Sequence, residues 1–523
     1  MLMVLLTFLL LISSASAATN VVLLTIDSCH ADRIGVYGGP AANTPNIDGW
    51  AGTAAVFKTA YSTSAWTAPG LVSILTGLYP AAHGVNTRDQ TGSPEMATLL
   101  KLFAARGFSV PNLTLFSFVP YFSNLGLPPP RPEYFGRREP QTLLNWLRTE
   151  GSEGPFFVWF HTTLLHLPYN LGLETVPRSR AELEQSPGLR AVLGGSVVPR
   201  GSVDFEGSDR KWLLKLYDGE LRRLDVFFGQ LLETLEQLRL KEETLIVLTA
   251  DHGEELLDHG FVGHASTSLA ARLYEEHTRI PLIISLPGTV AAGEVEDPVS
   301  QVDIAPTILT LFGQPVPSIM QGHDLFGEIP RRALFLESIV AGNLTSAEQQ
   351  DTWIRGVRRG PIKYLTSGEL YDLSTDPGET INLAADRPDA VAELHSEIDG
   401  WLTESLQLRR MRSRAPKANP AAGDPCPVVS SPTSNHRLNY ATSTGAIRVH
   451  WRGDLTTRYA VQYDIGQGAQ HVEGTYEVLG NVHVLGPYSE AIWNDLTGWN
   501  PFRFRVSPKG DVACWSEWAR FEF

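Results

Sequence analysis

Acidic and imidazole side chains directly follow two apolar runs of the chain. Asp27 follows the run 20–26, and Asp251 and His252 follow the run 244–250. A run that is apolar throughout is typical of a strand buried on both faces, and the carboxyl ends of such strands form the edge where open α/β sheets bind ligands. Carboxylates favour Ca²⁺, Mg²⁺ or Mn²⁺, and an imidazole shifts the preference toward Mn²⁺ or Zn²⁺. We therefore expect a divalent metal ion held by Asp27, Asp251 and His252.

A hydroxyl that could act as a nucleophile lies where a helix is predicted to begin. Thr67 suits an N-cap, Pro69 fits the first turn because its missing N–H costs little there, and Gly77 suits a C-cap. The free N–H groups and the positive dipole end of such a helix favour a bound anion and a developing alkoxide. Thr67 is therefore either only a cap or a cap that is also the nucleophile, and the predicted metal site favours the second interpretation.

Two histidines could supply general acid–base catalysis. His166 lies shortly after a third apolar run, 155–160, and His264 lies downstream of the predicted metal ligands. Because the pKa of histidine is near neutral pH, either side chain could protonate a leaving alkoxide. Asn86 and Arg88 follow the predicted nucleophile helix. They are weaker candidates for binding substrate oxygens, and the alternative is that they belong to a solvated loop.

Apolar runs alternate with helical patterns from residue 18 to about 405, which predicts a doubly wound α/β domain. Asp218 and Glu220 lie in a long amphipathic pattern and are expected at the surface or as capping groups. Residues 406–435 are rich in Arg, Pro, Ser and Ala and predict a linker. Residues 436–523 show short runs of alternating polarity, which predict a β-sandwich with an immunoglobulin-like or fibronectin-like outline.

The first 17 residues resemble a signal peptide, with an apolar run followed by a small-residue cleavage pattern. The alternative is an uncleaved anchor, although the run is shorter than the roughly 20 residues that span a bilayer. A cleaved signal predicts an exported protein, periplasmic or extracellular, with no stable membrane span in the mature chain. The net charge of −15 argues against nucleic acid as a partner. Of three cysteines, Cys426 and Cys514 could pair, whereas Cys29 is expected to be buried.

Six segments in order resemble the sulfatases and their relatives in the alkaline phosphatase superfamily. They are 26–32, Asn-Thr-Pro-Asn-Ile-Asp at 43–48, 67–77 with Tyr-Pro at 79–80 and His-Gly at 83–84, His-Leu-Pro-Tyr at 166–169, Thr-Ala-Asp-His-Gly-Glu at 249–254 with Gly-His at 263–264, and 370–383. The resemblance implies a mixed sheet flanked by helices, a divalent metal ion at Asp27, Asp251 and His252, and Thr67 at the position of the nucleophile. It implies an anionic ester as substrate, on a glycan or a lipid headgroup.

The departures from the family pattern change the expected chemistry. Sulfatases carry a Cys or Ser that is oxidised to formylglycine, followed by an Arg, where this chain has Thr67 and Leu71. Ser28 stands where sulfatases often have a second metal-binding carboxylate. With a threonine at this position, the chain resembles those relatives that transfer or hydrolyse phosphate and phosphonate esters through a covalent threonine intermediate. The segment 161–166 lacks the Asp-x-x-x-His pair of two-zinc relatives, which implies a single metal ion.

Three functions remain open from the sequence. The first is a metal-dependent hydrolase or transferase that acts on phosphate or phosphonate monoesters or diesters through Thr67. The second is a sulfuric ester hydrolase in spite of the threonine. The third is a catalytically silent sulfatase-like protein that binds anionic glycans or another protein.

Overall fold

The computed structural model describes residues 18–113, 119–128, 141–270, 272–339, 341–342 and 353–413, and beyond them the strands of a second region. The chain divides into two compact units, of which the first ends at Ser413 and the second holds residues 414–523. The predicted signal peptide, Cys426 and Cys514 lie outside the described residues. Among the residues that are described, no helix has the length and apolar character needed to cross a membrane.

A six-stranded mixed sheet forms the centre of the first unit, which confirms the predicted fold class. Its strand order is β10 (Gly293–Val295), β2 (Ala55–Phe57), β9 (Leu282–Ser285), β5 (Thr244–Ala250), β1 (Asn20–Ile26) and β4 (Phe157–Thr162). β1 runs parallel to both β4 and β5, whereas β9 runs antiparallel to β5 and β2. β1, β4 and β5 are buried along their whole length, as their apolar sequences predict.

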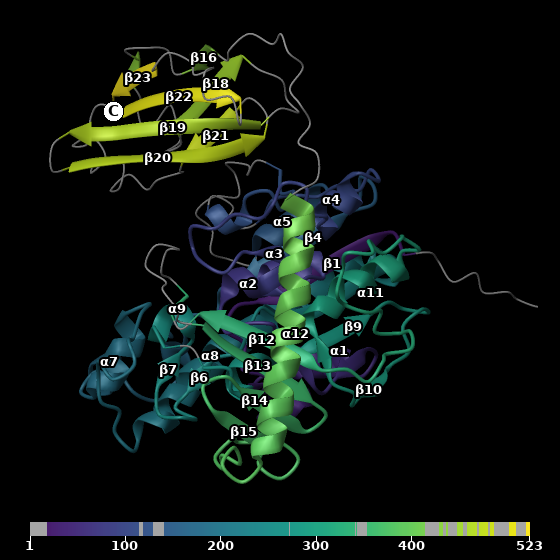
Figure 1. Ribbon diagram of the computed structural model, residues 1–523, viewed down its shortest axis with the longest axis vertical. Coiled ribbons are helices and arrows are strands. Elements are labelled where there is room, and N and C mark those ends of the chain that lie inside the picture. The colour runs from purple at the N-terminus through teal and green to yellow at the C-terminus, as the bar shows by residue number, and fades with distance from the viewer. Residues whose placement is uncertain are drawn as a thin grey trace, which may run out of the picture. The chain divides into compact units, whose positions relative to one another are not determined.

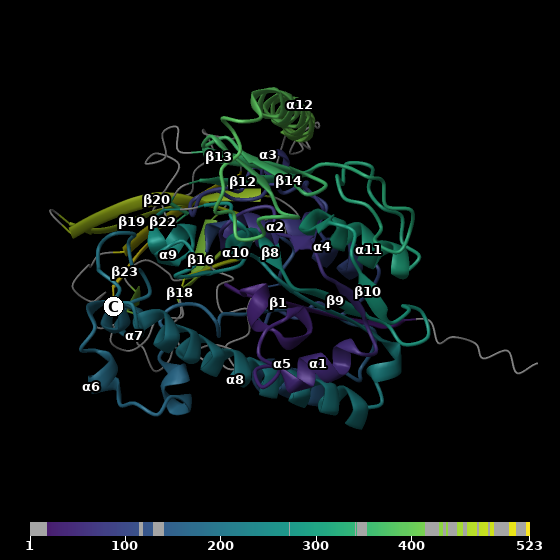
Figure 2. The ribbon, with the colours of Figure 1, turned by 90° about the horizontal axis from the view of Figure 1, so that it is seen from below.

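Helices cover both faces of this sheet (Figure 2). One face carries α1 (Pro45–Ala51), α5 (Gln141–Thr149) and α8 (Asp209–Gln237), and the other carries α2 (Thr67–Thr76), α4 (Leu99–Ala104) and α11 (Ile304–Leu311). The remaining short helices are α3 (Pro80–His83), α6 (Arg180–Leu183), α7 (Pro187–Gly194), α9 (Ala265–Ser268) and α10 (Glu275–Thr278). Short strands pair as β11 (Val299–Ser300), β3 (Ala60–Tyr61) and β8 (Arg279–Ile280), and as β6 (Glu255–Leu256) with β7 (Val262–Gly263).

A second, antiparallel sheet packs under the long helix α12 (Pro388–Ser413) (Figure 1). Its strands are β12 (Leu334–Ile339), β13 (Trp353–Arg359), β14 (Ile362–Leu365) and β15 (Glu369–Asp372). The Trp401 ring of α12 stacks on Phe335 at 4.8 Å. α12 continues past residue 405, where the sequence predicted a linker. The residues 406–413 explain this difference, because Leu, Gln, Arg and Met are strong helix formers and no Gly or Pro interrupts them.

The second unit is all-β, as predicted. One sheet contains β16 (Val428–Ser431), β18 (Ile447–Arg452) and β21 (Val482–Leu485). The other contains β17 (His436–Arg437), β23 (Ala519–Glu522), β22 (Phe502–Pro508), β19 (Arg458–Gln467) and β20 (Gln470–Leu479). Val461, Phe504 and Val506 are fully buried on neighbouring strands and form a core.

Candidate active site

The register of the central sheet brings the predicted metal ligands to one edge. Ile26, the last residue of β1, pairs with Thr162 of β4 and with Ala250 of β5, so the three strands end at the same level. Asp27 and Asp251 therefore emerge side by side, and both are buried. Ser28 has a φ of 60°, and its N–H donates to Asp251 while its hydroxyl donates to Asp27 at 2.8 Å. This turn holds the two carboxylates toward each other.

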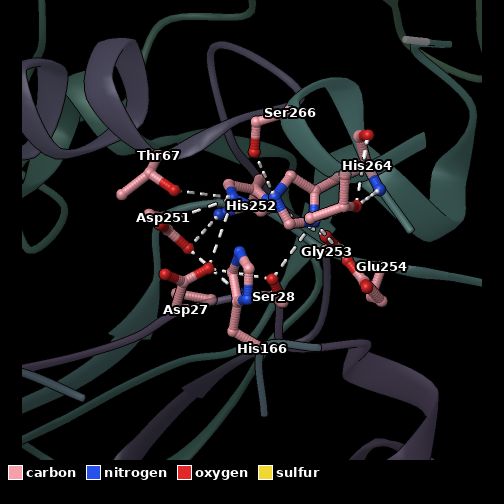
Figure 3. A network of polar contacts seen from close by, with 12 residues as sticks. Asp27, Ser28, Thr67, His166, Asp251, His252, Gly253, Glu254, His264 and Ser266 are labelled. Carbon is pink, nitrogen blue, oxygen red and sulfur yellow. Dashed lines mark hydrogen bonds and ion pairs between the residues drawn. The ribbon is translucent and has the colours of Figure 1, made fainter. Parts of the chain in front are cut away.

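His252 lies between these carboxylates and Thr67 (Figure 3). Its Nδ1–H donates to the carbonyl oxygen of Gly253 at 2.7 Å. Nε2 is then unprotonated, and its lone pair faces the site. Nε2 lies 3.6 Å from Asp27 Oδ1, 3.5 Å from Asp251 Oδ2 and 3.4 Å from Thr67 Oγ1. Atoms that share one divalent ion lie about 3.0–3.5 Å apart. Thr67 could thus be a fourth ligand.

Buried polar atoms without hydrogen-bond partners also indicate a cation between these side chains. Asp251 Oδ2 and His161 Nε2 are buried and have no hydrogen-bond partner among the described residues. His161 Nε2 lies 3.5 Å from Asp27 Oδ2, so His161 of β4 faces the same centre. Burial and the charge of Asp27 raise the pKa of Asp251 well above its usual range. Two buried carboxylates this close need a compensating positive charge, and a divalent ion would provide it.

Overlapping groups of described side chains have ligand atoms within 4.8 Å of one another. They are Asp27 with His161 and Asp251, Asp27 with His166 and His264, and His252 with Glu254 and His264. The sequence predicted Asp27, Asp251 and His252 as ligands. His161 was recognisable as a metal-capable residue at the end of the third apolar run, but neither it nor Glu254 was assigned to the site. The segment 249–254 contained Glu254 without indicating which way its side chain points.

Thr67 is the first residue of α2 rather than its N-cap. The N-cap is Trp66, which makes no side-chain capping hydrogen bond, whereas Gly77 is the C-cap in the left-handed region, as predicted. The Thr67 hydroxyl is therefore directed at His252 instead of the helix backbone (Figure 3). A Cβ at Gly70 would lie 2.4 Å from the Asp251 carbonyl oxygen. Glycine at this position allows the start of α2 to approach the end of β5.

His166 reaches the site from the loop after β4. Its Nδ1–H donates to the Leu167 carbonyl oxygen at 2.7 Å, so the other nitrogen is available to the pocket. Burial alone would lower the pKa of His166, but the Asp27 charge, the hydrogen bond to Leu167 and the nearby acids together raise it. Conversely, burial would raise the pKa of Asp27, and the charges of His166 and His161 hold it well below its usual range.

His264 is fully buried, and both its ring nitrogens already have partners. Nδ1 lies 2.6 Å from Glu254 Oε2, and Nε2 lies 2.8 Å from the Ser266 hydroxyl. Burial lowers the pKa of His264 well below its usual value. Glu254 in turn accepts from the Tyr169 hydroxyl at 2.7 Å. His264 is neutral and both its ring nitrogens are engaged in hydrogen bonds, so it is less suited than His166 to donate a proton.

A pocket of about 470 Å³ opens onto these groups. Its lining includes Asp27, Thr67, Arg88, His161, His166 and Ser266, with the aromatic rings of Trp66, Tyr121 and Phe122. Arg88 is the only lysine or arginine in this lining within the described part of the chain. Asn86 is outside the lining: it is buried, and its amide donates to the Pro80 carbonyl oxygen at 3.3 Å. Leu71, at the position of the sulfatase arginine, is fully buried.

The fold and this site define a member of the sulfatase family, ester hydrolases of the alkaline phosphatase superfamily. Residues 19–314 match the family model described as Sulfatase, so the chain belongs to this family. It is 26% identical over 437 residues to arylsulfatase A of Homo sapiens, a match that covers 70% of this chain and 83% of that protein. It is 27% identical over 293 residues to arylsulfatase K of Bos taurus, covering 49% of this chain and 53% of that protein. The match thus spans about half the length of arylsulfatase K.

Solved structures share the fold. The phosphonate monoester hydrolase of Agrobacterium radiobacter superposes with a TM-score of 0.57 at 20% identity, over 75% of this chain and 96% of that chain. A structure described as a 2-O GAG sulfatase superposes with a TM-score of 0.58 at 18% identity, over 77% of this chain and 95% of that chain. Hydrolases of phosphonate and of sulfate esters therefore both have this architecture.

Proposed function

We propose that this protein is a metal-dependent hydrolase or transferase of phosphate or phosphonate esters that forms a covalent intermediate on Thr67. The observation that carries the proposal is the position of the Thr67 hydroxyl at the start of α2, 3.4 Å from His252 Nε2 and beside two buried aspartates. A threonine side chain has no route to a formylglycine aldehyde, which supports its own hydroxyl as the nucleophile.

Asp27, Asp251 and His252 would hold the divalent ion, and Thr67 would complete the set. When bound, that ion would neutralise substrate charge and favour loss of the Thr67 proton to water. The Thr67 oxygen then attacks phosphorus, and a new P–O bond forms as the bond to the leaving oxygen breaks. The N-terminal N–H groups of α2 stabilise the negative oxygens that result.

His166 would act as the general acid in this step. Its free nitrogen faces the pocket, and Asp27 favours its protonated form. His166 gives its proton to the leaving alkoxide, and it can take a proton from the water or acceptor alcohol that later displaces Thr67. His264 would serve as a positioning residue, because Glu254 and Ser266 fix its ring.

Substrate class follows from the lining of the pocket. Arg88 supplies positive charge for a phosphoryl oxygen, and the rings of Trp66, Tyr121 and Phe122 suit an apolar or sugar portion. We propose an anionic ester on a glycan or lipid headgroup, one divalent ion in the catalytic site, and export to the periplasm or the cell exterior. The ulvan-active sulfatase of Formosa agariphila is 24% identical over 437 residues, which keeps sulfate esters as the second candidate.

A parallel assay of four esters tests this function. The full chain is incubated with 4-nitrophenyl phosphate, bis(4-nitrophenyl) phosphate, 4-nitrophenyl phenylphosphonate and 4-nitrophenyl sulfate, before and after removal of metal. We expect turnover of a phosphorus ester that depends on metal and is lost in Thr67→Ala. Equal activity of Thr67→Ala and wild type would exclude the covalent threonine. Metal binding without turnover of any ester would instead favour a binding protein.

A further inference from the structure

A second group of buried acid and imidazole side chains lies outside the catalytic pocket. It consists of Glu255 on β6 and of Glu276 and His277 on α10, and we call it the Glu255 cluster. All three side chains are buried, and their ligand atoms lie within 4.8 Å of one another. The Gly253 N–H donates to the His277 carbonyl oxygen at 2.8 Å, which fixes α10 against the segment leading into β6.

The hydrogen bonds of His277 direct a lone pair into this cluster. His277 Nε2 lies 3.1 Å from the Gly263 carbonyl oxygen, which can only accept, so the proton of the neutral ring is on Nε2. Burial lowers the pKa of His277 to about 4, so the ring is neutral at pH 7. Nδ1 is then an acceptor, fully buried, without a hydrogen-bond partner among the described residues, and 3.8 Å from Glu276 Oε1.

Glu255 presents a second unsatisfied acceptor. Its Oε1 accepts from the His259 backbone N–H at 2.5 Å, but Oε2 is buried and has no hydrogen-bond partner in the part of the chain that is described. Glu276 Oε1 accepts from the His259 ring at 2.7 Å. His259 therefore orients both carboxylates through one oxygen each, as residues behind metal ligands commonly do. Acceptors that face other acceptors in a buried space require a proton or a cation between them.

We propose that the Glu255 cluster binds a second divalent cation of the Zn²⁺ or Mn²⁺ type, through Glu255, Glu276 and His277. Ligand atoms about 2.0–2.2 Å from a tetrahedral Zn²⁺ are about 3.3–3.5 Å apart, so the observed 3.8 Å between His277 Nδ1 and Glu276 Oε1 needs only a small contraction. Two carboxylates and a neutral imidazole balance a charge of +2. Water would take the fourth position.

The rival occupant of the cluster is a proton. Burial, together with hydrogen bonding to Glu276, raises the pKa of Glu255 to about 10, so a protonated Glu255 could donate to Glu276. That arrangement satisfies Glu255 and leaves His277 Nδ1 without a donor. A cation satisfies both acceptors at once, which is why the geometry favours it.

Zinc content distinguishes the two occupants. The tag-free full chain is freed of metal with a chelator, incubated with excess Zn²⁺ and desalted. Its zinc content is then measured by inductively coupled plasma mass spectrometry. Asp251→Asn serves to empty the catalytic site, so the proposal does not depend on the proposed activity. We expect one zinc ion per chain in Asp251→Asn, retained in Asp251→Asn/Glu220→Gln and lost in Asp251→Asn/Glu255→Gln. Glu220 is the matched control, because it is another buried glutamate with one oxygen that has no hydrogen-bond partner among the described residues.

The proposal is overturned if Asp251→Asn alone retains no zinc. It is also overturned if Asp251→Asn and Asp251→Asn/Glu255→Gln retain equal amounts of zinc. In either case the cluster holds a proton shared between Glu255 and Glu276. Circular dichroism of each variant checks that it folds. If Glu255→Gln fails to fold, crystals of the zinc-loaded wild type decide instead. An anomalous peak at the zinc edge between Glu255, Glu276 and His277 supports the site, and a map with a peak only at Asp27 and Asp251 rules it out.

Discussion

The Nδ1 of His264 lies 2.6 Å from Oε2 of Glu254, and both side chains are fully buried. This pair holds the His264 ring at a centroid distance of 4.3 Å from His252, one of the proposed metal ligands. Glu254 is in turn fixed by the Tyr169 hydroxyl. The two residues thus form a support behind the catalytic groups.

Glu254→Gln should weaken the hydrogen bond that orients His264 without removing any of the proposed metal ligands. We expect kcat to fall about 10- to 100-fold, the range for residues that orient metal ligands. Tyr169→Phe, which removes the other hydrogen bond to Glu254, should have a smaller effect of the same sign. Steady-state kinetics with the best ester of the four measure both variants. Unchanged kcat in Glu254→Gln would show that His264 needs no anchor.

Replacement of Thr67 separates a nucleophile from a helix residue. Thr67→Ala should lower kcat/KM at least about 10³-fold, since loss of a nucleophile typically removes most of the rate enhancement. Thr67→Ser keeps the hydroxyl and should retain activity within about tenfold of wild type. Mass spectrometry of acid-quenched wild type should find a phosphoryl or phosphonyl group on the peptide that contains Thr67. A group found on another residue would assign the nucleophile elsewhere.

Metal removal should affect stability as well as activity. An ion that binds only the folded chain stabilises it by about 2.7 kcal/mol at a concentration 100 times its Kd. We therefore expect a chelator to lower the thermal unfolding midpoint and Zn²⁺ or Mn²⁺ to restore it. Asp251→Asn should show a smaller midpoint shift on addition of metal than wild type. Identical shifts in the two proteins would mean that Asp251 is not a ligand.

The positions of Asp27, Asp251 and His252 were predictable because three uniformly apolar runs indicate parallel strands whose carboxyl ends meet. The mixed sheet and the family were predictable from six ordered segments. The supporting contacts were not, because they join residues far apart in the chain. Asp218 and Glu220 were expected at the surface or as caps. Asp218 pairs instead with Arg33 at 2.6 Å, and Glu220 accepts from the Gly172 N–H, and both are buried.

The burial of Glu220 predicts a pH-dependent stability. Burial raises the pKa of Glu220 from its ordinary value of 4.5 to about 7. Below pH 4.5 the folded and unfolded states are both protonated, and the stabilising effect of the protonated form is complete. As the pH rises toward 7, the unfolded state ionises first, so stability falls, by at most about 3 kcal/mol. Glu220→Gln should reduce this loss.

Unfolding midpoints of wild type and Glu220→Gln, compared at pH 5 and pH 8, measure the effect. The variant should gain much more stability relative to wild type at pH 8 than at pH 5. A constant difference between Glu220→Gln and wild type at both pH values would contradict the assignment.

The close approach of α2 to β5 gives the last prediction. A Cβ at Gly70 would lie 2.4 Å from the Asp251 carbonyl oxygen, which is backbone and has little room to move. Gly70→Ala should therefore destabilise the first unit by about 1–3 kcal/mol, the usual cost of overpacking. It should also displace Thr67 from His252 and lower kcat more than it raises KM. Gly49→Ala in α1 is the control: its Cβ would meet nothing within 4 Å, so it should be neutral or stabilising by about 0.4–1 kcal/mol. Wild-type kcat in Gly70→Ala would show that the site tolerates a shift of α2, and that the contact with Asp251 does not position the nucleophile.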